Sequence, residues 1–214
     1  MKIMNTRLIF IMVLSLIILS SCTKNNFIKS GISVGRFDGS LLEYMEAPGH
    51  SYDWDSTALM VYHAGEEMVR LFEGQDPDHP EITFFGPTNH SIRRYMLEKN
   101  IEKVSDMDPD WCRQILLRHI CDGKIYRDDV PAGSGGNKIE IVEGGKQYTT
   151  LAGNVLWLYT TRGSYGNVDE AGAVKLNMYG MDKQQMVNIA STNIEPDNCV
   201  VHSLKYDYTI GKDL

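Results

Sequence analysis

The chain has 214 residues, which is long enough for one sizeable hydrophobic core or at most two small ones. Its composition is that of an ordinary globular protein. The formal net charge of -7 and the pI near 5.3 give no basic surface for phosphate backbones, so we set nucleic acid aside as a partner.

The first residues predict an export signal rather than a part of the fold. Lys2 and Arg7 give it a positive start, and the apolar run over residues 8–19 is too short to span a bilayer of roughly 30 Å as a helix. The run ends in Leu19-Ser20-Ser21-Cys22, which resembles the lipobox of bacterial lipoproteins. That resemblance implies a signal peptide over residues 1–21 and acylation of Cys22, with palmitate among the acyl groups.

Acyl chains on Cys22 would hold the protein on a membrane without a spanning helix. We therefore expect a location in the cell envelope of a Gram-negative bacterium, anchored to the outer membrane. The segment Thr23-Lys24-Asn25-Asn26 lacks the acidic residues that direct some lipoproteins to the cell exterior, so the periplasmic and surface faces both stay open. A plain secretory signal that is cleaved near a cysteine is the alternative.

The residues after the signal predict a tether and then one domain that starts with helices. Residues 22–35 are polar and glycine-spaced, as in a flexible tether, and the domain is expected over residues 36–210. Asp38-Gly39-Ser40 predicts the capped start of a short helix. Asp55 or Ser56 is expected to cap a second helix, with Leu59 and Tyr62 on its apolar side.

The stretch from Ile82 to Met96 predicts a buried strand, a corner and a helix. Ile82 to Phe85 is rich in β-branched and aromatic side chains, and Gly86-Pro87 ends the strand because proline has no amide for a ladder. Thr88 or Asn89 is expected to accept a hydrogen bond from the free amides of the helix that follows.

Asp106, Asp108 and Asp110 alternate like the start of a calcium loop. The loop would need a glycine at its sixth position and a glutamate at its twelfth, and neither is present. Asp108-Pro109 instead predicts a capped helix start. The helix is expected to continue to Ile120 with His119 on its apolar stripe.

The chain from residue 124 onward alternates with the period of strands. A hairpin is predicted between residues 138–142 and 146–149, followed by strands near residues 154–159, 174–179, 186–190 and 200–208. In the last of these, His202 lies in an apolar row. Helices followed by an antiparallel sheet predict an α+β fold with the helices packed on one side.

Several segments resemble the signatures of the fasciclin domain family. Thr83-Phe84-Phe85-Gly86-Pro87-Thr88-Asn89 is similar to its first box, and the segment from Glu195 to Leu204 is similar to its second. Leu116 to Ile120 and Thr150 to Gly153 resemble two segments between them. The structural signature residues that this resemblance assigns are Thr83, Phe85, Pro87, Thr88, Asn89, His119, Asn198 and His202.

The resemblance implies a compact β-wedge or sandwich of antiparallel strands with packed helices, used outside the cell for adhesion to proteins or glycans and rarely for catalysis. We expect no cofactor and no metal. The chain departs from the family pattern, which usually has alanine at Gly86, tyrosine at Arg118 and glycine at Cys199. Ser203-Leu204-Lys205 also lacks the Ile-Asp ending of the second box. Because Tyr-His has been linked to adhesion in animal members, Arg118 puts that particular contact in doubt.

The histidines and cysteines support structural roles. If His119 and His202 face the core, we expect both to be neutral, with polar groups near Thr88 and Asn89 as partners. A metal-binding or catalytic use of the pair is the alternative. The remaining cysteines are odd in number, and we expect all of them to be small apolar core residues: Cys112, Cys121 and Cys199.

We expect a lipid-anchored, non-catalytic protein that binds an extracellular or envelope protein or glycan. The loop around Arg162, Tyr165 and Asn167 is the predicted ligand-binding surface because it is long, glycine-spaced and polar. Trp54 and Trp157 are further candidates for stacking on sugars, with core packing as the alternative. The competing functions are an accessory subunit of an outer-membrane uptake or surface-fibre complex and a Ser/His hydrolase, for which no Gly-x-Ser-x-Gly elbow is present.

Overall fold

The computed structural model describes residues 35–134, 143–212 and 214. The signal, the tether and Cys22, which are predicted within residues 1–35, lie outside the described residues except for Gly35. The described part is one unit from Gly35 to Leu214. It combines helices with antiparallel-rich sheets, which confirms the predicted α+β class.

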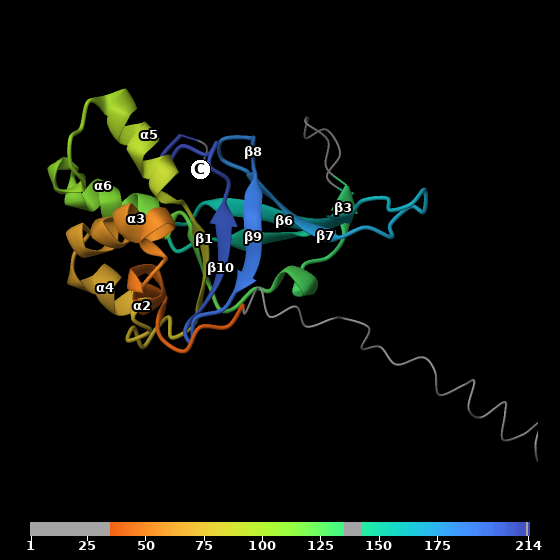
Figure 1. Cartoon of the computed structure of the whole chain (residues 1–214), viewed down its shortest axis with the longest axis horizontal. Helices are drawn as coiled ribbons and strands as arrows, with labels where there is room; N and C mark the ends of the chain where they lie inside the picture. The colour runs from red at the N-terminus through yellow and green to blue at the C-terminus, as the bar shows by residue number, and fades with distance from the viewer. Residues whose placement is uncertain (1–34, 135–142, 213) are drawn as a thin grey trace, which may run out of the picture. The chain divides into compact units, whose positions relative to one another are not determined.

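The helices come mainly from the first half of the chain and gather on one side of a sheet (Figure 1). The first begins at a capping box, because the Ser40 hydroxyl accepts from the Glu43 amide and the Glu43 carboxylate accepts from the Ser40 amide. The helices are α2 (Leu41–Glu46), α3 (Ser51–His63), α4 (Glu66–Phe72), α5 (Asn89–Lys99) and α6 (Pro109–Leu117), with single turns η1 (Val104–Asp106) and η2 (Arg127–Asp129).

Helix α3 differs from its prediction in both start and orientation. It begins at Ser51, so Asp55 and Ser56 lie inside it and do not cap it, and its N-cap residue His50 makes no side-chain capping bond. The predicted apolar residues Leu59 and Tyr62 point outward, with 56% and 49% of their surface exposed. The face that packs into the core instead carries Trp54, Thr57, Ala58, Met60 and Val61.

The first sheet has the order β2-β1-β10-β9 and carries both signature boxes. Its strands are β1 (Ile82–Gly86), β2 (Ile120–Asp122), β9 (Ile189–Ile194) and β10 (Cys199–Leu204). The central pair β1 and β10 is parallel, with Phe85 opposite His202, so the expectation of purely antiparallel strands is wrong at this position. Parallel neighbours need a long crossover connection, and here it contains most of the domain.

The second sheet is antiparallel throughout, in the order β5-β6-β7-β8. The predicted strand 138–142 lies outside the described residues. A two-stranded pair of β3 (Gly133–Ser134) and β4 (Glu143–Gly144) adjoins the second sheet. The sheet itself consists of β5 (Lys146–Thr149), β6 (Val155–Arg162), β7 (Val174–Gly180) and β8 (Gln185–Val187).

The core lies between the helices and the two sheets. It contains two tryptophans that were candidates for stacking on sugars. Trp54 and Trp157 are buried within α3 and β6, so neither is available to stack on a sugar. Helix α6 ends at Leu117 rather than Ile120, which places Cys112 on the helix and Cys121 on β2. Cys112, Cys121 and Cys199 are all buried and free.

Candidate functional site

Side chains of the two signature strands, β1 and β10, bond to the same loop at residues 123–125. The Thr83 hydroxyl on β1 donates to the Gly123 carbonyl at 2.7 Å and accepts from the Ile125 amide at 2.7 Å. The Ile125 carbonyl in turn accepts from Nε2 of His202 on β10, at 2.9 Å. The ring of His202 stacks on Phe85, with centroids 5.4 Å apart. The central strand pair is therefore bonded to one loop by the side chains of Thr83 and His202, and Phe85 packs against His202.

His119 and His202 are fully buried, and their partners differ from those predicted. Nδ1 of His119 is 2.7 Å from the Ile115 carbonyl, so this nitrogen carries the proton, and Nε2 accepts from the Tyr208 hydroxyl at 2.6 Å. Neither histidine bonds to the Thr88 or Asn89 side chain, because those groups lie near the start of α5. Burial lowers the pKa of each imidazole to about 4, which keeps both neutral at pH 7.

Asn89 and Asn198 join distant helix ends by side-chain amides. Nδ2 of Asn89 donates to the carbonyls of Ser51 and Tyr52 at 2.8 Å each, and its Oδ1 accepts from the Ser56 amide at 2.6 Å. This amide ties the first turn of α3 to the start of α5, while the His50 carbonyl accepts from the amides of Asp53 and Trp54. Asn89 and Thr88 make no side-chain cap for α5, contrary to prediction, and the buried Thr88 hydroxyl has no partner among the described residues.

Asn198 connects the second box to two helices. Its Oδ1 accepts from the Leu41 amide at the start of α2, at 2.8 Å. Its Nδ2 lies 3.2 Å from the Phe72 carbonyl and 3.4 Å from the Leu71 carbonyl, at the end of α4. Both helix termini present backbone groups without intrahelical partners, so one amide side chain satisfies groups at each.

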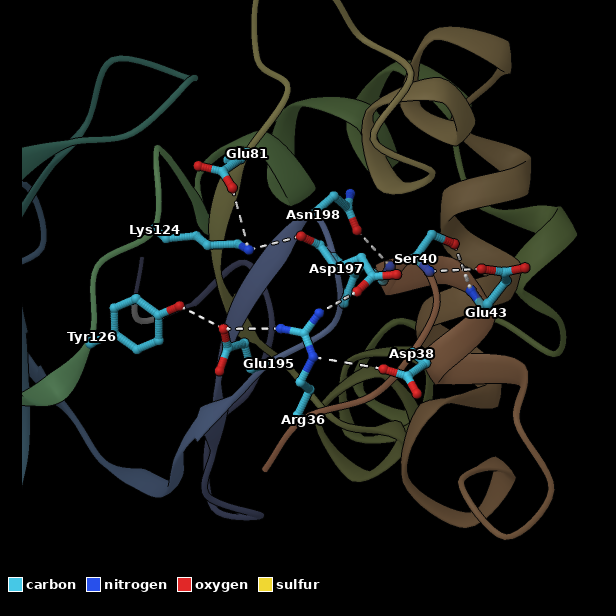
Figure 2. A network of polar contacts seen from close by, with 11 residues as sticks. Arg36, Asp38, Ser40, Glu43, Glu81, Lys124, Tyr126, Glu195, Asp197 and Asn198 are labelled. Carbon is cyan, nitrogen blue, oxygen red and sulfur yellow. Dashed lines mark hydrogen bonds and ion pairs between the residues drawn. The ribbon is translucent and has the colours of Figure 1, made fainter. Parts of the chain in front are cut away.

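A polar network fastens the beginning of the described chain to the second box (Figure 2). The guanidinium of Arg36 lies 3.0 Å from Asp197 and 3.6 Å from Glu195, and Lys124 donates to the Asp197 carbonyl at 2.7 Å. Tyr126 donates to Glu195, and this bond raises the pKa of the Tyr126 hydroxyl to about 12. These groups bond to one another and to the backbone of the second box, so the network holds the segment in place.

One protein-family model matches most of the domain. The model of the family described as "Fasciclin domain" matches residues 58–206, well over half of the chain. The chain belongs to the fasciclin domain family. The domains of this family are typically adhesion-related and non-catalytic.

A solved structure similar to this fasciclin chain is a FAS1 domain pair from the insect cell adhesion molecule Fasciclin I, at 18% identity and a TM-score of 0.36. The alignment covers 63% of this chain and only 38% of the insect chain. No curated protein sequence matches the chain.

The departures from the fasciclin boxes have local explanations. A Cβ added at Gly86 would lie 2.6 Å from the six-membered ring of Trp54, so the indole occupies the space of the usual alanine methyl. Cys199 fills a fully buried position opposite Ile82 on β1. Arg118 extends from the end of α6 to Asp182, with 3.3 Å between Nη2 and Oδ2.

The predicted ligand-binding residues lie on the hairpin between β6 and β7, away from the helical side (Figure 1). Tyr165 is 77% exposed and pairs through its backbone with Val168. Gly166 and Asn167, between them, both have positive φ, of 58° and 64°, as a type I′ turn requires. Asn167 therefore has a conformational role in forming the turn.

Arg162 is separated from this tip and lines a cavity of about 520 Å³ at the end of β6. Arg127, Thr160 and Val174 share the lining. Arg127 is paired with the neighbouring Asp128 at 2.8 Å, whereas Arg162 makes no ion pair to the residues that the structure describes. The structure thus places Arg162 in a recess and Tyr165 and Asn167 on the exposed turn.

The described residues contain no cluster of three or more metal-ligating side chains. Within the same part of the chain, no helix has the length and apolar character needed to cross a membrane. All of the signature side chains are buried, so they act as scaffold.

Sequence reasoning missed an exposed group of aromatic rings formed by Tyr52, His90 and Tyr206. The group is brought together by tertiary structure from three distant segments, and the only local signal was the position of His90 and Tyr206 beside the two boxes.

Proposed function

We propose that this protein is a non-catalytic binding protein of the adhesion type, anchored to a membrane of the Gram-negative cell envelope by acyl chains on Cys22. Membership of the fasciclin family supports the adhesion role. The lipobox-like segment that ends at Cys22 supports the anchor, and the positive, apolar start of the chain supports export.

The observation that carries the non-catalytic part is the complete burial of the two signature histidines. A general base must come within hydrogen-bond distance of the proton that it removes from a substrate. His119 and His202 are each 0% exposed, and each ring donates to a backbone carbonyl. They support the packing of the loop and strands, and this favours a binding protein over a Ser/His hydrolase.

The contact with a protein or glycan partner is proposed at the β6–β7 hairpin and the adjoining recess. Tyr165 offers an exposed aromatic ring at the hairpin tip, and Arg162 offers a cation that makes no ion pair with a described residue in a recess that Asp128 and Glu170 also line. Aromatic and arginine side chains are enriched where interfaces gain most of their energy.

The anchor is tested by expressing the full chain in a Gram-negative host with an alkyne-labelled palmitate. We expect label on the wild-type chain, which sediments with membranes, and none on Cys22→Ala, which is released by salt washing. A labelled Cys22→Ala chain, or an unlabelled wild type, would contradict the anchor.

The binding role is tested by mild crosslinking of intact cells and purification of the full chain. A partner that is captured by wild type and lost in Arg162→Ala/Tyr165→Ala supports the proposed surface, with Leu97→Ala as the control because Leu97 is 79% exposed on α5. Loss of capture with Leu97→Ala as well would show that the surface is elsewhere. Turnover in a broad esterase and glycosidase screen, abolished by His119→Gln in a folded chain, would overturn the non-catalytic role.

A further inference from the structure

Three aromatic rings converge on the surface where the parallel signature strands end. Parallel neighbours carry their carboxyl ends at the same edge, so the residues after β1 and after β10 come together there. His90 follows β1 and Tyr206 follows β10, and their ring centroids are 4.5 Å apart. Tyr52, from the first turn of α3, adds a third ring 5.8 Å from His90. We call these residues the aromatic cluster.

The aromatic cluster is exposed although its rings are large. Tyr52 is 70% exposed and Tyr206 is 51% exposed, while His90 lies half-buried between them. Tyrosine side chains carry a large apolar surface, and several of them gathered on one face typically mark a binding surface rather than random exposure.

The backbone on both sides of the aromatic cluster is held by buried or bidentate side-chain bonds. Asn89, next to His90, donates to the carbonyls of Ser51 and Tyr52. Arg94 donates through both terminal nitrogens to the carbonyls of Tyr206 and Asp207. Because these bonds exist before any ligand arrives, less conformational entropy is lost when a ligand binds the rings.

Polar groups border the rings. The Tyr206 hydroxyl donates to Oδ1 of Asp53 at 3.3 Å, and the half-buried Asp53 retains further acceptor positions on its carboxylate. The imidazole of His90 makes no hydrogen bond to any residue in the described ranges. Aromatic faces bordered by hydroxyl, carboxylate and imidazole groups suit a pyranose ring, whose C–H face packs on an aromatic ring while its hydroxyls bond at the edge.

We propose that the aromatic cluster is a binding site for a neutral glycan, whose sugar rings present C–H faces that pack on tyrosine. The ring planes are tilted by 44° between His90 and Tyr206 and by 66° between Tyr52 and His90, so the two exposed tyrosines offer separate faces to the sugars. Asp53 and the net charge of -7 disfavour an acidic glycan. The cluster is also small, whereas a stable protein interface buries about 800 Å² per partner. This site rests on the proposed binding function and adds to it a ligand class and a second surface.

The test measures the affinity of the purified full chain, in detergent micelles, for cellohexaose and chitohexaose by calorimetry. We expect at least one of these probes to bind, and Tyr52→Ala and Tyr206→Ala each to weaken binding roughly tenfold through loss of a stacking ring. Tyr206→Phe keeps the ring and should retain most of the affinity. Leu97→Ala, an exposed apolar residue on α5, is the matched control and should bind like wild type.

Charge selectivity gives a second readout. Hexagalacturonate, which carries carboxylates, should bind weakly to wild type and more tightly to Asp53→Asn, because the substitution removes the repulsion and keeps an acceptor. Near-ultraviolet circular dichroism and thermal unfolding confirm that each variant is folded.

The proposal is overturned if neither neutral hexasaccharide binds the wild-type chain, or if both alanine variants bind as tightly as wild type. A protein partner that is captured on cells and lost with both Tyr52→Ala and Leu59→Ala would reassign the outer face of α3 to protein binding, since Leu59 lies beyond the cluster on that helix. In a further outcome, a partner is captured in a way that depends on Arg162 and Tyr165 while the wild-type chain binds neither hexasaccharide. That result would support the proposed adhesion function and overturn only the glycan site.

Discussion

The first sheet and the hairpin of the second sheet differ in how they use polar and aromatic residues. In the first sheet, β1 and β10 are buried at every position, and polar side chains such as Thr83 and His202 are bonded to a neighbouring loop. In the second, β6 and β7 continue into a hairpin whose tip exposes Tyr165. The comparison indicates that the family signature specifies the scaffold, whereas groups free to meet a partner lie at the strand ends.

The largest effect should come from lowering the pH, because the first sheet contains two neutral histidines. Their folded pKa is about 4 and the ordinary value is 6.5, so between these values the unfolded chain binds protons that the folded chain does not. Stability is therefore complete above about pH 6.5 and falls as the pH drops towards 4, by up to about 3 kcal/mol per histidine.

Urea unfolding of the full chain at pH values from 7 to 5 measures this slope before most carboxylates titrate. His119→Gln cannot take up the proton at that site and should lose about half of the slope, provided that it is folded at pH 7. A free energy of unfolding that stays constant over this range would show that the histidines are not buried as neutral groups.

The next largest loss of stability should come from removing the side-chain amide of Asn198, which joins α2 and α4. Asn198→Ala leaves the Leu41 amide and the Leu71 and Phe72 carbonyls without this partner, which should lower the free energy of unfolding by about 2–4 kcal/mol. The matched change in the second sheet is Asn177→Ala, whose amide bonds to Tyr159 and Thr161 at a half-buried position. We expect a loss below about 1 kcal/mol there. Equal losses, measured by chemical denaturation, would remove the distinction between the sheets.

Two glycines, one in each sheet region, allow the comparison to be tested by adding a single methyl group. Gly86→Ala at the end of β1 places a Cβ 2.6 Å from Trp54 and should destabilise the protein by about 1–3 kcal/mol. Gly163→Ala, at the hairpin of the second sheet, meets nothing within 4 Å and should be neutral or slightly stabilising. The double variant Gly86→Ala/Trp54→Phe should recover part of the loss, and a double-mutant cycle by thermal unfolding measures that recovery.

The smallest effect should be at the hairpin tip. Tyr165→Ala removes a side chain that is 77% exposed, so the free energy of unfolding should change by less than about 0.5 kcal/mol. Thermal unfolding checks this value. A larger loss would mean that Tyr165 packs as part of the fold, which would weaken its proposed role in binding a partner.

Features formed within a few residues could be predicted from the sequence. Asp108 caps α6 by accepting from the Trp111 amide, with Pro109 at the first helical position, and both signals lie in one short stretch. The start of α3 could not be predicted, because the amide that orders it belongs to Asn89, 38 residues beyond Ser51. Local propensity contains no information about such a partner.

The pattern of residues in the strands likewise did not show how the strands pair. Alternation and β-branched residues indicated β1 and β10 but not their parallel pairing, since a single strand has the same pattern in either direction. His119 was expected to face inward on a helical stripe and is buried, although α6 ends at Leu117 and His119 lies beyond it. Its partner Tyr208 lies 89 residues away. The aromatic cluster was missed for the same reason, because Tyr52, His90 and Tyr206 become neighbours only after folding.

The free thiols have a consequence for the protein at the envelope location proposed above. Burial raises the pKa of Cys112 to about 11 and of Cys121 to about 12, and Cys199 is raised further still, so the folded domain holds almost no reactive thiolate. In the oxidising envelope that we propose, wrong disulfides and crosslinked copies can form only while the chain is open. For a chain exported as proposed, folding before oxidation would therefore protect the three thiols from disulfide formation, and disulfide-linked chains would indicate earlier unfolding.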